Sequence, residues 1–311
     1  MNRIRSRGRS ARVALASAIL LPVLGAICAA PALAGSPAVH RPEDRVVRSA
    51  PVDERTPVQG SGFTAWAAAE PGFPYRYDVF VKRFDGRPIK VNGPGTTAFA
   101  GGIDGHTLVY QQSGGGRSSI RFHDLRTGVD RPAPRKVNSA AHQSGPSLSG
   151  RWLLFTRRFT EPTVWKVLLY DMDRGRVRTL QTVSGPWARY AQSGQVAGDW
   201  AAWQVCAPYC NAFVERISTG QRWMAPNPEH RFQYAPSVRD DGTMFFARSS
   251  AACGNVTLMR FRPGSDPVPV IVLANDLSTT YTSRDSSGRT VILYDATRCT
   301  DYLADIHRIS I

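Results

Sequence analysis

Residues 145–180 read GPSLSGRWLLFTRRFTEPTVWKVLLYDMDRGRVRTL, and this stretch decides the fold because it predicts four short strands in succession. The first strand, a, ends in a turn at Ser149–Gly150. The apolar run Trp152–Phe155 is typical of a strand b that is buried on both faces. Residues 164–171 form strand c, and a tight turn at Arg174–Gly175 leads into strand d at residues 177–181.

The glycines of these two turns recur along the chain at intervals of about 45 residues. The a–b series is Gly62, Gly105, Gly150, Gly198, Gly242 and Gly288, and the c–d series is Gly86, Gly128, Gly175, Gly220 and Gly264. Each glycine is expected to supply the positive φ that a two-residue hairpin turn requires. A fixed period of roughly 40–50 residues filled with short strands indicates a β-propeller. A twisted array of β-sandwich units would not explain the even spacing.

We therefore predict an all-β, six-bladed β-propeller over residues 46–311. The sixth repeat reaches its strand c near Ile311 and has no strand d. A spare strand around Arg45–Ser49 precedes strand a of the first repeat at Thr56–Gln59. We expect this N-terminal strand to complete the last blade and to close the ring, which would protect the edges of both blades.

Several repeats also carry a common motif. Pro146–Phe155 resembles the repeat of TolB-like propellers, also called the WD40-like PD40 repeat, whose pattern is roughly P-x-x-S-x-D-G-x-x-h-h-F with h apolar. Pro236–Ser237, Asp241–Gly242 and Met244–Phe246 form a second match, and Thr282–Leu293 a looser one. The resemblance covers the repeat region and implies a bacterial propeller without the additional N-terminal domain of TolB. TolB-type propellers are periplasmic interaction platforms, a role that needs a double-membrane envelope of which this sequence gives no sign.

The first 34 residues have the organisation of an export signal. Five arginines lie within the first 12 residues, Val13–Leu24 is an apolar run too short to span a bilayer comfortably, and Ala32-Leu33-Ala34 is a small-x-small cleavage site. The alternative is an N-terminal membrane anchor. We predict cleavage of residues 1–34, a flexible polar segment at residues 35–45, and secretion by a Sec-type signal. The mature protein is expected to be free or associated with the cell envelope, without stable membrane insertion.

Four cysteines remain after the signal: Cys206, Cys210, Cys253 and Cys299. In an exported protein they indicate two disulfides, for which three connectivities exist. We prefer Cys206–Cys210 within one connection and Cys253–Cys299 between equivalent connections of neighbouring blades. A four-cysteine zinc site is the alternative, but such sites usually show two close pairs. No metal and no cofactor are expected.

The mature chain keeps 34 basic residues against 24 acidic ones, which gives a net charge of +10. Long-range attraction then favours an anionic partner, such as a polymer of the cell envelope. An arginine-rich composition inherited from a GC-rich genome is the alternative explanation. No run of consecutive basic residues marks a nucleic-acid patch, so nucleic acid is not an expected partner.

The repeat assigns its turns to two opposite faces. The a–b and c–d turns are tight and share one face, whereas the b–c and d–a connections are predicted to be longer and define what we call the long-loop face. Binding residues concentrate on such connections. In five repeats an aromatic residue or histidine lies six to eight residues before the a–b glycine, where it would lie near the rim of the channel: Phe99, His142, Tyr190, Tyr234 and Tyr281.

The candidate ligand-binding residues are Tyr190, Tyr234, Tyr281, Arg231, His142, Trp187 and Arg189. Aromatic rings together with arginine and histidine suit a carbohydrate or an anionic ligand, through stacking and bidentate hydrogen bonds. The alternative is that a repeat protein packs the same bulky residue at the same site of every blade.

Catalytic signatures are weak in this sequence, which has neither a G-x-S-x-G nor an H-E-x-x-H motif. Glu229, His230 and Glu161 fall on the long-loop face and are the candidates for acid–base chemistry. We predict a secreted, monomeric, non-enzymatic module that binds a protein or an anionic cell-envelope polymer. The alternative is a hydrolase or lyase that acts on an acidic glycan at the mouth of the channel.

Overall fold

The computed structural model describes residues 42–185, 190–249, 256–273, 275–298, 300–301 and 303–311. The chain divides into residues 1–41 and a compact unit at residues 42–311. The predicted signal therefore lies outside the described residues. Strand β1 begins at Glu43, inside the segment that the sequence predicted to be flexible. Within the described ranges, no helix is long and apolar enough to cross a membrane.

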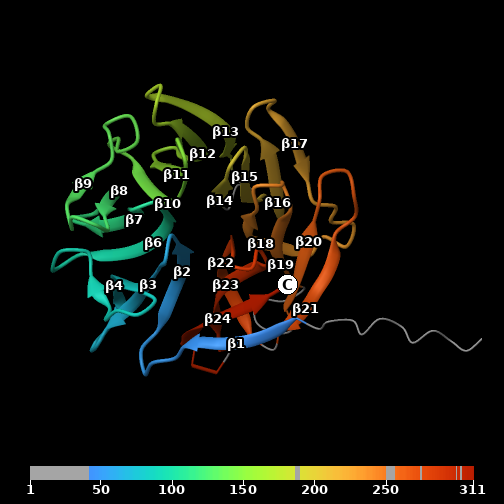
Figure 1. Cartoon of the computed structure of the whole chain (residues 1–311). Coiled ribbons are helices and arrows are strands. Elements are labelled where there is room, and N and C mark those ends of the chain that lie inside the picture. Colours follow the sequence, from blue (N-terminus) through green and yellow to red (C-terminus); the bar gives the residue numbers. More distant parts are fainter. Residues whose placement is uncertain (1–41, 186–189, 250–255, 274, 299, 302) are drawn as a thin grey trace, which may run out of the picture. The chain divides into compact units, whose positions relative to one another are not determined.

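The unit at residues 42–311 is a six-bladed propeller, as the glycine period predicted, and each blade is a four-stranded antiparallel sheet (Figure 1). Blade 1 contains β2 (Glu54–Gly60), β3 (Phe63–Glu70), β4 (Phe73–Arg83) and β5 (Ile89–Lys90). Blade 2 contains β6 (Thr97–Asp104), β7 (Thr107–Gly114), β8 (Arg117–Asp124) and β9 (Asp130–Pro132). Blade 3 contains β10 (His142–Ser149), β11 (Trp152–Thr160), β12 (Thr163–Asp171) and β13 (Arg176–Ser184).

The second half of the ring repeats this order. Blade 4 contains β14 (Tyr190–Ala197), β15 (Trp200–Cys206), β16 (Cys210–Arg216) and β17 (Gln221–Met224). Blade 5 contains β18 (Phe232–Val238), β19 (Met244–Ser249), β20 (Val256–Phe261) and β21 (Val268–Leu273). Blade 6 contains β22 (Asp276–Arg284), β23 (Thr290–Thr297), β24 (Ala304–Ser310) and, as its outermost strand, β1 (Glu43–Arg48).

The pairing of β1 with β24 fits the predicted closure of the ring. The two strands are antiparallel, with Glu43 opposite Ser310 and Val46 opposite His307. Tyr294 donates a hydrogen bond of 2.7 Å to Asp44, and the His307 ring lies 3.1 Å from the same carboxylate. The N-terminal strand thus contacts the last two strands of the chain by side chains as well as by backbone.

The tight turns follow the glycine series closely. Every a–b glycine has a positive φ, and so do Gly128, Gly175, Gly220 and Gly264 of the c–d series. Gly86 does not, so the expectation of a positive φ was wrong there. The turn in blade 1 instead closes by a hydrogen bond from the Gly86 backbone N–H to the Arg83 carbonyl, 3.1 Å.

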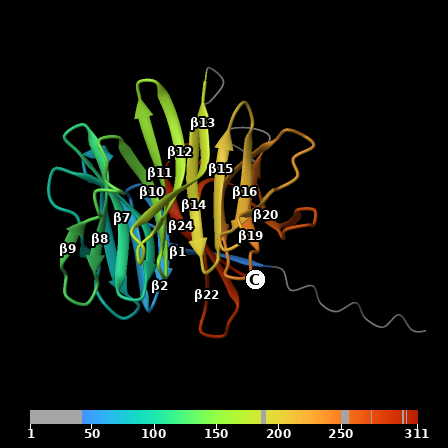
Figure 2. The same cartoon turned by 90° about the horizontal axis from the view of Figure 1, so that it is seen from above.

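The b–c connections are shorter than the sequence predicted. In blade 3, β11 and β12 continue to Thr160 and Thr163, so that only Glu161 and Pro162 form the turn. Likewise only Gly115 and Gly116 join β7 to β8. The strand ends there pair with each other beyond the buried part of each blade. Those of blade 2 are polar, and those of blade 3 include the exposed Phe159, so neither pair shows the alternation that marks a half-buried strand. Figure 2 shows the hairpins standing side by side, with their ends on two opposite faces.

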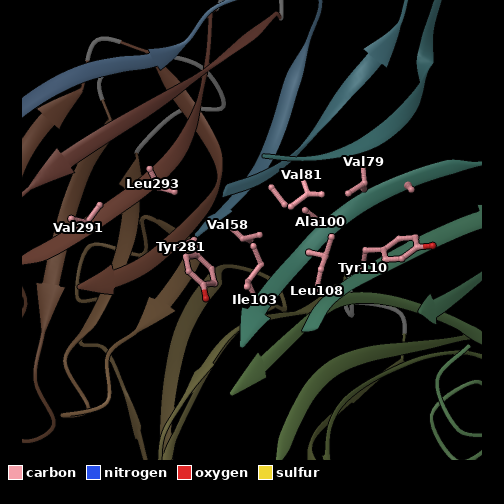
Figure 3. Packing of buried hydrophobic residues seen from close by; sticks show 12 residues of the cluster. Val58, Val79, Val81, Ala100, Ile103, Leu108, Tyr110, Tyr281, Val291 and Leu293 are labelled. Carbon is pink, nitrogen blue, oxygen red and sulfur yellow. The ribbon is translucent and has the colours of Figure 1, made fainter. Parts of the chain in front are cut away.

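The hydrophobic core lies between the blades. One cluster joins Val58 and Val79 of blade 1 to Leu108 and Tyr110 of blade 2 and to Leu293 of blade 6 (Figure 3). Comparable clusters lie between the other neighbouring blades. Because each fully buried side chain of this size is worth about 1.5–3 kcal/mol, the rigidity of the ring comes from these contacts.

Candidate functional site

The inner strands of all six blades line a central cavity. It has a volume of about 280 Å³ and is bounded by residues of β2, β6, β10, β14, β18 and β22. Its lining is mostly uncharged and mixes apolar residues with polar side chains, among them Gln192 and Gln204 of blade 4 and Ser278 and Thr279 of blade 6. Arg55 is the charged residue of this lining.

A bulge interrupts every inner strand. The pairing shifts between Arg55 and Val58, Ala100 and Gly102, Ser144 and Ser147, Ser193 and Val196, Tyr234 and Ser237, and Leu277 and Thr280. Bulges bend a strand and redirect its side chains. The residues just outside each bulge are therefore the ones that face the mouth of the channel.

The bulges alternate between two kinds. In blades 1, 3 and 5 the bulge holds a residue with positive φ followed by proline: Thr56-Pro57, Gly145-Pro146 and Ala235-Pro236. In blades 2 and 4 it holds Gly101 or Gly194. A Cβ at Gly101 would lie 2.2 Å from the carbonyl oxygen of Pro146, and one at Gly194 would lie 2.1 Å from that of Pro236. The ring is therefore built from three pairs of blades: 2 with 3, 4 with 5, and 6 with 1.

The same side-chain position joins the two blades of each pair. Gln111 accepts a hydrogen bond from the Gly145 backbone N–H (3.3 Å), and Gln204 accepts one from the Ala235 N–H (2.6 Å). In the third pair this position is Asp295, which accepts from the Thr56 N–H at 3.4 Å. The Asp295 carboxylate also accepts hydrogen bonds from the backbone N–H and hydroxyl of both Ser278 and Thr279. Asp295 is fully buried, and burial raises its pKa.

Another buried side chain crosses the channel below the bulges. The amide of Gln195 donates to the Thr282 carbonyl (2.8 Å) and accepts from the Thr282 N–H (2.9 Å). These residues belong to blades 4 and 6, which are not neighbours, and both are 4% exposed. Thr282 lies nearer the a–b turn of blade 6 than Ser278 and Thr279 do, so the cross-link spans the channel on the a–b side of those two residues.

At the long-loop end a second cavity of about 530 Å³ opens beside the channel, which we call the mouth cavity. Tyr190, Tyr234, Phe232, Cys210, Asp276 and Leu277 line it, together with Gln192, Gln204, Ser278 and Thr279, which it shares with the channel. Tyr234 donates a hydrogen bond of 2.5 Å to Asp276. Burial and the Asp276 carboxylate raise the pKa of Tyr234, so this hydroxyl stays protonated and its ring is fixed against blade 6.

Tyr190 extends the mouth cavity toward blade 3. Gln204 donates to its hydroxyl at 3.3 Å, and its ring lies edge-on to Trp165 with 6.4 Å between centroids. The Arg158 guanidinium packs over the Trp165 ring, 5.3 Å from its centroid. Aromatic surface and one cation therefore continue from the mouth cavity across the neighbouring blade.

The structure brings together some of the predicted ligand-binding residues and separates others. Tyr190 and Tyr234 line the mouth cavity, and Tyr281 lines the channel, where burial raises its pKa to about 12. Phe99 also lines the channel, whereas His142 lies on the edge of blade 3 opposite Arg158. The five aromatic or histidine positions thus occupy different levels of the inner strands. Trp187 and Arg189 lie outside the described residues.

The candidate catalytic residues lie away from both cavities. Glu229 forms an ion pair with Arg231, and the His230 ring stacks on Tyr209 with 4.8 Å between centroids. Glu161 is exposed at the tip of the β11–β12 hairpin. Neither the channel nor the mouth cavity is lined by Glu229, His230 or Glu161, or by Arg231, which was predicted as a ligand-binding residue.

The predicted disulfide between Cys206 and Cys210 is confirmed and joins the ends of β15 and β16. It lies against the mouth cavity, where the Tyr190 hydroxyl is 4.0 Å from the Cys210 Sγ. Cys253 and Cys299 lie outside the described residues.

Sequence reasoning missed Asp276, Gln192, Gln204, Ser278 and Thr279. The signal that could have located them is the proline that follows a bulge in every second repeat, at Pro57, Pro146 and Pro236. This proline marks the level at which the inner strands bend. It therefore also indicates which neighbouring residues face the channel. These polar residues carry no motif of their own.

No family model matches the chain, and no curated protein matches it. Solved structures match it over most of its length. A putative gluconolactonase has a TM-score of 0.56 at 11% identity, over 88% of this chain and 93% of that one. TolB from Acinetobacter baumannii has a TM-score of 0.55 at 15% identity, over 81% of this chain. The propeller domain of the Trilobed protease from Pyrococcus furiosus has a TM-score of 0.52 at 12% identity, over 83% of this chain and 95% of that one.

The chain spans 64% of the length of the Acinetobacter baumannii TolB. At these identities the likeness establishes the propeller fold that the TolB-like repeat implied.

Proposed function

We propose that this protein is a secreted, non-enzymatic binding module that holds an anionic cell-envelope polymer at the long-loop end of its channel. The observation that carries the proposal is the mouth cavity, which Tyr190 and Tyr234 line together with hydrogen-bonding side chains of blades 4 and 6. Its volume of about 530 Å³ lies in the range of ordinary ligand sites, roughly 300–1,000 Å³.

The chemistry of the mouth cavity suits a hydroxyl-rich unit of such a polymer. Gln192 offers an amide that can donate and accept, and the Ser278 and Thr279 hydroxyls, which donate to Asp295, keep lone pairs that can accept from a ligand. The tyrosine rings offer flat apolar surface against which a sugar ring can stack. The excess of basic residues in the chain supports the anionic character of the polymer through long-range attraction.

The same lining argues for binding rather than for hydrolysis. Glycoside hydrolysis commonly uses two carboxyl groups within about 10 Å of each other across the scissile bond. Asp276 is the carboxylate that lines the mouth cavity, and Glu161 and Glu229 do not line it. A glycoside hydrolase that uses two carboxyl groups therefore has no such pair among the residues that line the two described cavities.

We also propose that β1 closes the ring and so holds the inner strands at the mouth in place. Its pairing with β24 supports this role, as does the position of β22, which lines both cavities and belongs to the same sheet. Propellers are protected from edge-to-edge association when the first and last blades are joined.

Binding of polygalacturonate, measured by isothermal titration calorimetry against neutral dextran, tests the polymer proposal. We expect polygalacturonate to bind, and we expect its binding to weaken as salt is added. Arg158→Ala/Lys166→Ala removes two cations of the long-loop face and should weaken binding roughly tenfold, since exposed ionic contacts are worth up to about 1 kcal/mol each.

Arg126→Ala/Arg176→Ala is the matched control, because it removes the same charge beside c–d turns on the opposite face. Equal losses in the two double variants would show that the polymer responds only to net charge and would overturn the proposed binding face.

A further inference from the structure

The six inner strands present equivalent positions around the mouth. In blades 2, 4 and 6 the first residue of the inner strand is Thr97, Tyr190 or Asp276, and each pairs with the corresponding residue of strand b. In blades 1, 3 and 5 the residue just before the bulge is Arg55, Ser144 or Tyr234. A repeated structural requirement would place similar side chains at equivalent positions.

Blades 4, 5 and 6 depart from that expectation together. They contribute two tyrosines and a carboxylate to one cavity, while blades 2 and 3 carry Thr97 and Ser144 at the same positions. The fold therefore does not require Tyr190, Tyr234 and Asp276, and their convergence on one side of the channel points to a ligand.

Asp276 is the charged residue of this cavity, and its carboxylate is only half satisfied. Its Oδ1 accepts hydrogen bonds from the Tyr234 hydroxyl and from the Leu277 N–H, at 2.5 and 2.8 Å. Within the described ranges its Oδ2 has no hydrogen-bond partner, and Asp276 forms no ion pair there, although basic residues outnumber acidic ones in the chain. A carboxylate that lines a cavity without a cation beside it favours a positively charged ligand.

The surrounding groups select an organic cation. Tyrosine faces attract ammonium groups, and Tyr190 and Tyr234 lie on the same cavity as the carboxylate. No group of three or more His, Cys, Asp or Glu side chains in the described part of the chain could hold a metal ion. The neighbouring amides and hydroxyls of Gln192, Gln204 and Thr279 would pair with hydroxyl groups beside the ammonium.

We propose that the mouth cavity binds the ammonium group of an amino sugar, with Asp276 as its counter-ion and the Tyr190 and Tyr234 rings beside it. This inference rests on the proposed function in that the amino sugar is a unit of the bound polymer. The protein, which has a net positive charge, attracts the anionic groups of that polymer. The cavity, which contains the Asp276 carboxylate, then binds the amine of the polymer.

Calorimetric titration with glucosamine trisaccharide, N-acetylglucosamine trisaccharide and ethylamine tests the inference. The free amino sugar should bind at least about tenfold more tightly than its N-acetylated form, which has no charge to pair with Asp276. Tighter binding of the trisaccharide than of ethylamine identifies a sugar-borne amine, and equal binding identifies a free amine as the source of the ammonium. Equal binding of the two trisaccharides would overturn the inference.

Asp276→Asn should abolish the preference for the free amine, whereas Asp266→Asn, the same change at an exposed c–d turn, should preserve it. Tyr234→Phe provides a second variant, since it keeps the ring and removes only the hydrogen bond to Asp276. An unchanged preference in Asp276→Asn would contradict the assignment. Loss of polygalacturonate binding leaves this result unaffected, so failure of the proposed function and failure of this inference are distinguishable.

Discussion

Two buried acidic residues distinguish the seam between blades 6 and 1 from its two equivalents. Asp295 stands where the other seams have Gln111 and Gln204. Glu54 of blade 1 is fully buried, and the corresponding residues of blades 3 and 5 are the neutral Gln143 and Gln233. Since the other two seams carry neutral amides at these positions, the acidic groups give the seam between blades 6 and 1 a dependence on pH that the amides do not give the others.

Burial raises the pKa of Asp295 above its ordinary value of 3.8. Folding therefore favours the protonated form, and the contribution of this group to stability is complete below pH of about 4 and is lost as the pH rises through the folded-state pKa. Each unit by which the pKa is raised is worth about 1.4 kcal/mol. Burial raises the pKa of Glu54 as well, which adds a dependence of the same sign.

Asp295→Asn cannot ionise and imitates the amides of the other seams. We expect its free energy of unfolding, measured by urea denaturation between pH 4 and pH 8, to fall less with rising pH than that of the unchanged protein. Parallel curves for the two proteins would show that Asp295 does not titrate differently in the folded state.

At the scale of strands, the bulges position the mouth, and close backbone contact between paired blades fixes them. Gly194 lies against the Pro236 carbonyl and against the Ala202 carbonyl, where an added Cβ would approach within 2.1 and 2.9 Å. Both obstacles are backbone atoms, which cannot turn aside as a side chain can. The inner strands must therefore keep glycine at this level of blade 4.

Gly194→Ala should destabilise the protein by about 2 kcal/mol or more, because overpacking against rigid neighbours typically costs 1–3 kcal/mol. Gly93→Ala is the matched control, since nothing lies within 4 Å of the added Cβ and the backbone φ is ordinary. Thermal unfolding of both variants checks the prediction, and similar melting temperatures would contradict it.

Strand-level prediction succeeded where residues alternate or form apolar runs, as at Trp152–Phe155, and where a glycine turn follows. It failed at the tips of the β7–β8 and β11–β12 hairpins, where the strands continue to pair beyond the buried part of the blade. Tyr190 and Tyr234 could be nominated from their recurrence before the turn glycine. Asp276 could not be nominated in this way, because what marks it is the hydrogen bond that it accepts from the Tyr234 hydroxyl of the neighbouring blade, 42 residues away in sequence.

For the whole molecule, the proposed closure uses a strand that is about 250 residues from its partners in sequence, since Tyr294 donates a hydrogen bond to Asp44. Ser310 of β24 lies opposite Glu43 of β1, so a short turn after Ile311 could lead directly into residues 43–50. The sheet of blade 6 would then be continuous in sequence like the other five.

Deletion of residues 1–50 should lower the melting temperature and promote association through the exposed edge of β24. A circular permutant that carries residues 43–50 after Ile311 should recover both the melting temperature and the monomeric state. Size-exclusion chromatography and thermal unfolding check this, and a deletion variant as stable as the full chain would show that β1 is dispensable for closure.

The central claim is that the long-loop end of the channel is the binding site. Hydrogen–deuterium exchange of the full-length protein with and without polygalacturonate tests it most directly. The account predicts slower exchange at residues 190–195, 232–235 and 276–279, which line the mouth cavity and the channel. Protection confined to the a–b and c–d turns of the opposite face, or no protection at all, would contradict it.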